Sequence, residues 1–321
     1  MRQAIITGPT GAVGMALIDN LISEGIKVAA IVRPGSKRAE RIPMHELVTK
    51  IECELSELDK LPELLSRSGF ETGSAECRQE GLVFYHLGWD GTFGNSRNNM
   101  HGQNLNVKYS LDAVDAAHAC GCEAWIGTGS QAEYGRFEGK LNASVPAFPE
   151  NGYGIAKLCA GQMTRIACEQ AGMRHVWTRI LSIYGPYDGD GTMVMSTIAA
   201  LLAGETPKCT KGEQQWDYLY SKDAGRALML IGEKGVSGKT YCIGSGKTRP
   251  LSEYIEVIRD TVNKSADIDF GAVPYAPKQV FYLCADIEDL KKDTGFEPQT
   301  EFEDGIKSTV EYVKGLQSNR K

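Results

Sequence analysis

The sequence of 321 residues lacks any long apolar segment. No apolar run approaches the roughly 18 residues that a membrane-spanning helix needs. The first residues, Met-Arg-Gln, lead directly into an apolar segment without the pattern of a secretory signal. We therefore expect a cytoplasmic location and no membrane partner.

The sequence also has no excess of positively charged residues. Lys and Arg total 35 and Asp and Glu total 41, so the formal net charge is −6. Proteins that bind nucleic acids usually carry a basic excess. The composition therefore offers no support for a nucleic-acid partner.

Cysteine and histidine are too scattered to indicate a metal centre. The nine cysteines are an odd number, and only Cys120 and Cys122 lie close together. No CxxC pair with matching histidine spacing occurs, so we expect reduced thiols and no bound metal. His86 ends an apolar run and is interpreted as a buried core histidine.

Alternation of short apolar runs with helical patterns dominates the first 180 residues. Apolar residues make up 42% of the chain and charged residues 24%, as in an ordinary globular protein. Strands are expected at 4–7, 27–32, 81–87, 124–128 and 175–180, and helices at 13–24, 58–65, 105–120 and 154–171. Such alternation predicts an α/β fold with a doubly wound parallel sheet of the Rossmann type.

The alternation of strands and helices ends after residue 184, where a turn-rich segment, 185–191, follows. Beyond it, helices are expected at 193–203, 223–231 and 250–263, and extended segments at 216–220 and 240–243. We predict a dinucleotide-binding Rossmann domain over 1–183 and a smaller C-terminal α/β substrate-binding lobe over 184–321. Chain crossings between the two are expected, since no long linker separates them.

A glycine-rich segment, Thr7-Gly-Pro-Thr-Gly-Ala-Val-Gly14, joins the first strand to the first helix. Gly8 permits a tight turn, Gly11 lets the backbone approach a pyrophosphate, and Gly14 lets the helix pack closely on the strand. The free amides at the start of the helix then hold the anion. This context predicts a dinucleotide site.

The second strand is followed by Arg33-Pro-Gly-Ser36-Lys37-Arg38. Sites selective for NAD usually carry Asp or Glu here to bind the ribose hydroxyls. A guanidinium can instead grip a 2′-phosphate with paired hydrogen bonds. The segment therefore favours NADP (NADPH) over NAD, unless these charges only solvate a loop.

Tyr153 and Lys157 stand four residues apart, so on a helix they share a face. A free phenol has a pKa near 10, and a neighbouring cation lowers it by favouring the phenolate. Upstream, the strand at 124–128 leads to Ser130. A YxxxK pair arises often by chance, but together with this serine and the glycine loop it indicates an oxidoreductase site.

These motifs together resemble the extended short-chain dehydrogenase/reductases, which include the nucleotide-sugar epimerases, dehydratases and reductases. The resemblance spans nearly the whole chain. Its matching segments are TGPTGAVG at 7–14, YHLG at 85–88, Asn106, GTGSQAEYG at 127–135, YGIAK at 153–157, RILSIYGP at 179–186, WDYLYSKDA at 216–224, Gly244-Ser-Gly246 and Asp286.

The resemblance implies roles for individual residues. Tyr153 would be the general acid/base, Lys157 would lower its pKa and hold the nicotinamide ribose, and Ser130 would bind the reacting oxygen. The expected cofactor-binding residues are Gly8, Thr10, Gly11, Ala12, Val13, Gly14, Arg33, Ser36, Glu54, Leu55, Leu87, Gly88, Asn106, Thr128, Tyr153, Lys157, Leu181 and Ser182.

Departures from the family pattern concern the substrate. The resembling 4,6-dehydratases carry an acid where this chain has Ala132, and Glu133, one place later, should point elsewhere, which argues against dehydration. Trp216 replaces an arginine that binds the substrate diphosphate, and a second such arginine is replaced around Ala276, with Lys278 nearby. The expected substrate-binding residues are Trp89, Thr92, Gln131, Glu133, Trp216 and Lys278. Both tryptophans could equally serve only in packing.

The combined pattern favours an NADPH-dependent 4-keto-sugar reductase acting at C4 of a nucleotide-activated sugar. One alternative is an epimerase that oxidises C4 transiently, and another is a non-catalytic NADP-sensing protein that binds a protein partner. A homodimer is also expected, because two helices resemble those of a four-helix interface in this superfamily. The small residues that would permit close approach there, unless they pack on the sheet, are Ala113, Ala116, Ala117, Ala156, Ala160 and Gly161.

Overall fold

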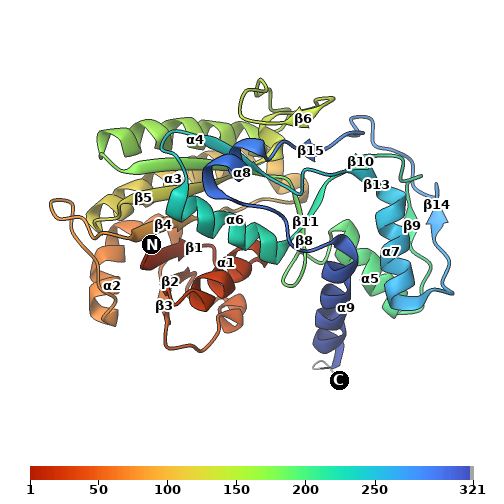
Figure 1. Cartoon of the computed structure of the whole chain (residues 1–321), viewed down its shortest axis with the longest axis horizontal. Helices are drawn as coiled ribbons and strands as arrows, with labels where there is room; N and C mark the ends of the chain where they lie inside the picture. Colours follow the sequence, from red (N-terminus) through yellow and green to blue (C-terminus); the bar gives the residue numbers. More distant parts are fainter. Residues whose placement is uncertain (319–321) are drawn as a thin grey trace.

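A seven-stranded parallel sheet forms the centre of this computed structural model, which describes residues 1–318 (Figure 1). The strand order is β12-β7-β5-β4-β1-β2-β3. The strands are β1 (Gln3–Thr7), β2 (Lys27–Val32), β3 (Val48–Glu52), β4 (Leu82–His86), β5 (Ala124–Ser130), β7 (Arg174–Ile180) and β12 (Thr240–Ile243). The order reverses between β1 and β4, so the predicted doubly wound sheet is confirmed, and ligands of such sheets bind at this reversal.

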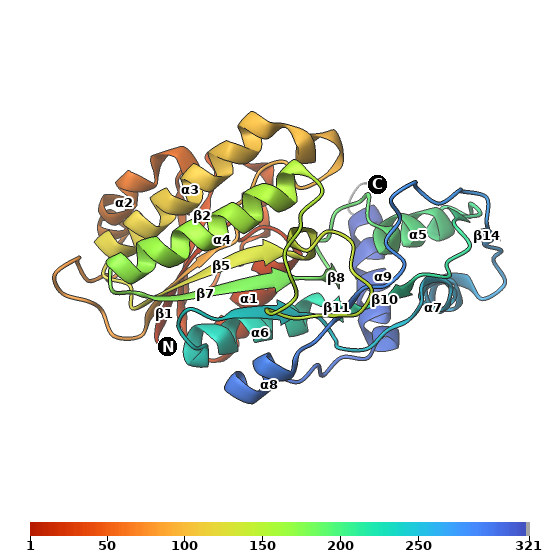
Figure 2. The same ribbon diagram turned by 90° about the horizontal axis from the view of Figure 1, so that it is seen from above.

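Helices cover both faces of the sheet, as Figure 2 shows. Alternate strand residues point to opposite sides: Ala4 and Ile6 belong to one buried cluster, and Ile5 belongs to the other. The first face is covered by α1 (Ala12–Ser23), α6 (Ser221–Lys234) and α8 (Glu288–Thr294), and the second by α2 (Leu61–Ser68), α3 (Met100–Ala119) and α4 (Gly152–Gln170). Burial on both faces explains the continuous apolar strands.

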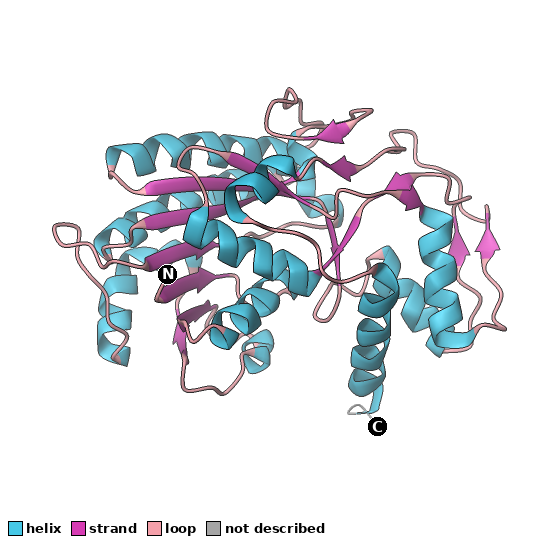
Figure 3. Cartoon of the chain, in the orientation of Figure 1, coloured by secondary structure: helices cyan, strands magenta, loops and turns pink. Residues whose placement is uncertain are grey.

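The second lobe packs three helices around an aromatic core. These helices are α5 (Met193–Leu202), α7 (Leu251–Asn263) and α9 (Phe302–Ser318). Tyr184, Tyr254 and Phe302 meet at the centre of the lobe. The strands outside the central sheet are short (Figure 3): β6 (Lys140–Leu141), β8 (Ser182–Tyr184), β9 (Lys208–Cys209), β10 (Gln215–Trp216), β11 (Tyr218–Tyr220), β13 (Arg249–Pro250), β14 (Asp269–Phe270) and β15 (Cys284–Ala285).

The chain crosses between the two lobes more than once. After β11 it returns to the sheet, where α6 packs on α1 and β12 pairs with β7. Residues 221–243 therefore belong structurally to the central sheet layer, although they follow residue 183 in sequence. Strand β3 was absent from the predicted strands because its sequence, VTKIE, has no continuous apolar run.

The small residues of α3 and α4 pack inside the subunit. Ala113, Ala117 and Ala160 are fully buried in the cluster on the sheet face, and Ala116, Ala156 and Gly161 are also buried. A Cβ at Gly161 would press on the indole of Trp177. The prediction that these residues line a dimer contact is therefore wrong, since they serve helix-to-sheet packing.

Three further properties of residues 1–318 bear on function. No helix in that range is long and apolar enough to cross a bilayer. No group of three or more His, Cys, Asp and Glu side chains in the same range is arranged to hold a metal ion. All nine cysteines are free thiols.

Candidate functional site

The glycine loop lies against the carboxyl end of β4. Gly8 has a φ of +66°, and a Cβ there would come within 2.6 Å of the Gly88 nitrogen. Gly14 allows α1 to contact Pro9, whereas a Cβ at Gly11 would meet nothing within 4 Å. Since Gly11 caps α1 without a side-chain hydrogen bond, the first amides of the helix stay available to an anion.

Arg41, in the segment between β2 and β3, contacts this glycine loop. It lies in η1 (Lys37–Arg41), and its Nη1 donates to the Thr10 carbonyl at 3.0 Å. Its guanidinium also stacks on Tyr187, 5.4 Å from the ring centroid. Sequence analysis missed Arg41, because its role depends on a contact across the fold and no local motif marks it.

Of the cations that suggested NADP, Arg33 follows β2 directly, and Lys37 and Arg38 begin η1. Arg33, Lys37 and Arg38 are exposed, and Ser36 is half-buried. Leu55 begins η2 (Leu55–Lys60), and its side chain is the nearest neighbour of a Cβ built at Gly88, at 3.0 Å. The residues predicted to surround the adenine end therefore gather at one edge of the sheet.

Asn106, predicted to line the cofactor, and His86, interpreted as a core histidine, both support the structure around the end of β4. The Asn106 amide accepts from the Asp90 nitrogen at 3.0 Å and donates to the Asp90 carbonyl at 2.9 Å, so it fixes the loop after β4. His86 is buried, and its ring nitrogens lie 2.9 Å from Thr7 Oγ1 and 3.3 Å from Ser110 Oγ. Its burial and these two contacts agree with its interpretation as a core histidine, and burial lowers its pKa to about 3.

The structure brings Ser130, Tyr153 and Lys157 together. Ser130 ends β5, while Tyr153 and Lys157 lie on the first turns of α4, whose N-terminus is capped by Asn151. Gly154 lets this helix approach the serine loop, because a Cβ there would collide with the Ala132 carbonyl. The predicted trio therefore forms one site at the carboxyl end of the sheet.

Lys157 lies beneath Trp89 in the interior of this site. Its Nζ donates to the Thr128 carbonyl at 2.6 Å and lies 3.7 Å from the centroid of the Trp89 ring. The lysine is only 4% exposed. Burial lowers its pKa to about 7, and the charge of Glu133 acts in the opposite direction.

Arg97 is the cation that most directly affects Tyr153. It lies in η3 (Gly94–Asn98), and its guanidinium carbon is 4.6 Å from the Tyr153 ring centroid, whereas Lys157 Nζ is 5.9 Å away. Burial raises the pKa of Tyr153, and the hydrogen bond with Ser130 and the charge of Arg97 lower it. Lys157 Nζ contacts the Thr128 carbonyl and the Trp89 ring, and its effect on the pKa of Tyr153 stays a prediction. No motif pointed to Arg97.

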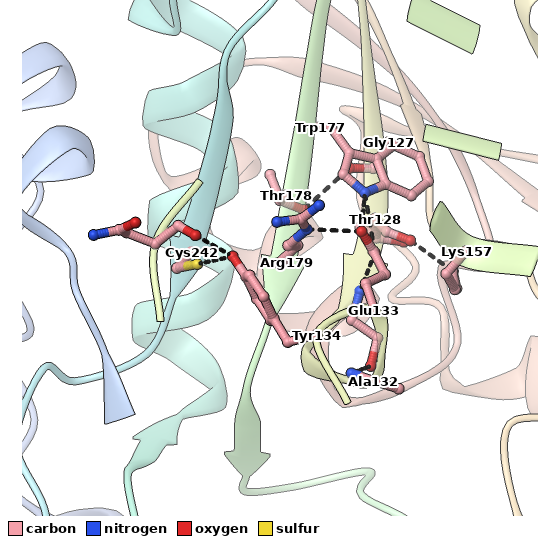
Figure 4. Close-up of polar contacts among 12 residues, drawn as sticks. Gly127, Thr128, Ala132, Glu133, Tyr134, Lys157, Trp177, Thr178, Arg179 and Cys242 are labelled. Carbon is pink, nitrogen blue, oxygen red and sulfur yellow. Dashed lines mark hydrogen bonds and ion pairs between the residues drawn. The ribbon is translucent and has the colours of Figure 1, made fainter. Parts of the chain in front are cut away.

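Glu133 is at the centre of a buried polar network, shown in Figure 4. The carboxylate is fully buried and accepts from the Ser130 nitrogen at 2.8 Å, Arg179 Nε at 2.7 Å and Trp177 Nε1 at 3.1 Å. Burial raises the pKa of Glu133, and Arg179 opposes this effect. The assignment of Glu133 to substrate binding is wrong, because no face of its carboxylate is left exposed. The expectation that it points away from the dehydratase position is confirmed.

A cavity of about 530 Å³ lies in the second lobe. Its lining includes Met193, Cys209, Gln214 and Trp216, and among its described lining residues only Lys208 is charged. Trp216 Nε1 donates to Ser182 Oγ at 2.8 Å, which links the cavity to the strand that follows Leu181.

The remaining predicted substrate residues do not all converge. Trp89 packs edge-on against Tyr153, with 6.1 Å between the ring centroids. Thr92 lies on the loop after β4 and Gln131 in the short helical turn after β5, and both are half-buried, while Lys278 is exposed on the loop before β15. Trp216 lines the cavity of the second lobe, so the two tryptophans lie in different parts of the molecule.

Comparisons with known proteins agree with this architecture. Residues 4–244 match the model of the NAD dependent epimerase/dehydratase family. A dTDP-glucose 4,6-dehydratase from Xanthomonas campestris is 27% identical over 183 residues, covering 54% of this chain and 52% of that protein. The chain thus spans about half the length of this curated relative.

Two solved structures share the fold over almost their whole length. A UDP-N-acetylglucosamine 4-epimerase from Methanobrevibacter ruminantium has a TM-score of 0.85 at 24% identity, with 98% of this chain and 99% of that chain covered. A UDP-glucuronic acid 4-epimerase from Bacillus cereus, in complex with NAD, has a TM-score of 0.80 at 19% identity and the same coverage.

Proposed function

The chain belongs to the NAD dependent epimerase/dehydratase family, and we propose that it transfers hydride between a nicotinamide dinucleotide and C4 of a nucleotide-activated sugar. Net reduction of a 4-keto sugar is the reaction that we favour. The observation that carries this proposal is the convergence of Ser130, Tyr153 and Lys157 at the sheet edge that also holds the glycine loop.

The residues present fit a dinucleotide. The uncapped amides of α1 and the open space at Gly11 suit a pyrophosphate. Gly88 has no side chain, so the glycine loop and Leu55 can both lie close to it. When bound, the dinucleotide supplies or accepts the hydride. Ala12, Val13 and the residues around Thr128 would complete its site.

Tyr153 would move the proton. In the reductive direction its hydroxyl gives a proton to the carbonyl oxygen, and Ser130 holds that oxygen by a hydrogen bond. Lys157 would hold the nicotinamide ribose from its position on the Thr128 carbonyl.

Dehydration is disfavoured by the two residues after Gln131. Ala132 has no acidic group, and the Glu133 carboxylate accepts hydrogen bonds from Arg179, Trp177 and the Ser130 nitrogen. A carboxylate held in this way cannot exchange protons with a sugar. This supports reduction or epimerisation rather than loss of water.

We favour NADPH as the electron donor. Arg33 is exposed at the end of β2 with Ser36, Lys37 and Arg38 beside it, and no acidic residue stands at the position after that strand. Such a group of cations suits a 2′-phosphate. NAD is the alternative.

The nucleotide would lie in the cavity of the second lobe. Trp216 offers a ring for stacking, and the Gln214 side chain, 3% exposed, has an oxygen with no hydrogen-bond partner among the described residues. A buried acceptor without a partner is unfavourable, so a donor on a ligand would relieve it. A nucleobase carries such donors.

A homodimer would bury the outer faces of α3 and α4. Leu105, Ile155, Met163 and Ile166 are apolar residues of these two packed helices, and each is between 43% and 52% exposed. Several exposed apolar side chains on two neighbouring helices are typical of association sites.

The test is a turnover assay with NADPH and a panel of 4-keto nucleotide sugars, followed at 340 nm, with product identification by mass spectrometry. Oxidation of NADPH in step with sugar reduction supports the reductase. Interconversion of C4 epimers without net NADPH oxidation would establish the epimerase instead. Cofactor binding without turnover on any sugar would point to the sensor.

A further inference from the structure

The segment between β4 and α3 docks onto the start of the helix that carries Tyr153. The Gly152 nitrogen donates to Asn98 Oδ1 at 3.0 Å, and a Cβ at Gly152 would lie only 3.0 Å from the Arg97 carbonyl. This close contact sets the position of η3 relative to α4. It places the Arg97 guanidinium over the Tyr153 ring, at 4.6 Å from the centroid.

Arg97 has no carboxylate partner in residues 1–318. No acidic oxygen in that range lies within 4.0 Å of its nitrogens, and its one hydrogen bond is a long one, 3.5 Å, to the Thr92 carbonyl. Glu133, the nearest buried acid of the site, is already paired with Arg179. The half-buried guanidinium therefore keeps most of its five donors free.

The same segment extends from the tyrosine toward the cavity of the second lobe. Phe93 is the nearest neighbour of a Cβ built at Gly189, at 3.5 Å, and the Thr192 side chain caps α5 just before Met193, which lines the cavity. The Arg97 guanidinium contacts the Tyr153 ring and donates to the carbonyl of Thr92, the residue before Phe93. The segment therefore contacts both Tyr153 and the residues that precede α5.

The cavity itself supplies little positive charge, since Lys208 is the one charged residue in its described lining. A nucleotide-activated sugar, in contrast, carries a negatively charged diphosphate, and some sugars carry a carboxylate as well. We propose that Arg97 binds an oxyanion of the activated sugar next to Tyr153. This inference rests on the proposed function.

Two groups could provide that oxyanion: the diphosphate that links nucleoside and sugar, or a carboxylate on the sugar. Both are recognised by the planar fork of a guanidinium, through paired charge-assisted hydrogen bonds. Lysine keeps the charge but loses the fork, so the two substitutions Arg97→Gln and Arg97→Lys separate charge from geometry.

The experiment measures binding by calorimetry to the NADPH-loaded full-length protein. The probes are a nucleoside diphosphate and its glucose and glucuronate esters, in uridine and thymidine series. Arg97→Gln should weaken binding of the relevant probe at least tenfold, and Arg97→Lys should restore part of the loss. Arg67→Gln is the matched control, because Arg67 forms an exposed ion pair with Glu63 on α2.

The probes distinguish the two sources of charge. Equal weakening for all three probes assigns Arg97 to the diphosphate, while selective weakening for the glucuronate ester assigns it to a sugar carboxylate. In either case the salt dependence of binding should be shallower for Arg97→Gln than for the wild type, and NADPH affinity should be unchanged. A purely structural role would not produce this dependence on ligand charge.

If Arg97→Gln binds every probe as tightly as the wild type does, this inference is overturned, and the proposed function is not affected. A wild-type protein that binds NADPH but none of the probes overturns the proposed function and this inference together. Activity of the wild type on nucleotide sugars, measured separately, shows which of the two has failed.

Discussion

Arg179 Nε donates to Glu133 Oε2 at 2.7 Å, and the two side chains are 7% and 0% exposed. The pair joins β7 to the short turn η4 (Gln131–Glu133) that follows Ser130. Glu133 also accepts from the Ser130 nitrogen, so the ion pair and the serine turn form one unit. Gly129 makes this possible, because a Cβ there would collide with the Glu133 carboxylate and the Trp177 indole.

Breaking this pair should destabilise the protein strongly. Glu133→Gln leaves the Arg179 charge buried without its counter-charge, and removal of one partner of a buried pair typically costs about 3–5 kcal/mol. The loss would be measured by denaturant unfolding. Arg136→Gln, which removes an exposed pair with Glu150, is the control and should cost less than about 1 kcal/mol. Similar small losses for both variants would contradict the role of Glu133.

Removal of the Tyr153 hydroxyl should affect chemistry and not binding. Tyr153→Phe keeps the ring that contacts Arg97 and Trp89. Since positioned proton transfer contributes about 10²–10⁴-fold, turnover should fall by that factor while the NADPH dissociation constant stays the same. Tyr109→Phe, a half-buried tyrosine on α3, is the control. Full turnover in Tyr153→Phe would remove the tyrosine from the mechanism.

Burial of Lys157 should appear in the pH dependence of stability. Its pKa is about 7 in the fold against 10.5 for an ordinary lysine, so between these values the unfolded chain binds a proton that the folded site lacks. Stability should therefore rise with pH across this window. Relative to Lys157→Met, the wild-type free energy of unfolding should increase by up to about 1.4 kcal/mol per pH unit, and stay constant below pH 7.

Denaturant titrations of the cofactor-free proteins between pH 6 and 10 would measure this difference. Groups other than Lys157 titrate in both proteins, so their contributions largely cancel. A difference that does not change with pH would mean that Lys157 is charged in the folded protein throughout the range.

The parts of the molecule that were predictable from sequence depend on local patterns. Continuous apolar strands followed by helices specify a parallel sheet, and the spacing of glycines, serine, tyrosine and lysine specifies their place at its edge. Arg41 and Arg97 were not predictable, because each acts through a contact with a loop or helix distant in sequence. Glu133 was misassigned as a ligand contact because its partner Arg179 lies on another strand.

The exposed apolar faces of α3 and α4 predict a dimer that one charge can disrupt. Ile155 is 52% exposed and Met163 43% exposed. Ile155→Asp or Met163→Asp would place a carboxylate in the contact, so light scattering should shift from a dimer toward the 35.0 kDa chain. Val236→Asp, at a similarly exposed position after α6, should leave the particle size unchanged. A monomeric wild type at micromolar concentration would contradict the dimer.

Two arginines near the glycine loop should affect cofactor binding in different ways. Arg33 is exposed at the predicted 2′-phosphate position, so Arg33→Ala should weaken NADPH at least tenfold, in line with the roughly 1.5–3 kcal/mol of a charge-assisted hydrogen bond, and leave NADH nearly unchanged. Arg41 instead holds the loop through the Thr10 carbonyl, so Arg41→Ala should weaken both cofactors to a similar extent. Fluorescence titration with NADPH and NADH would measure the four affinities. Equal weakening of the two cofactors by Arg33→Ala would refute the preference for NADPH, and would leave the dinucleotide site itself intact.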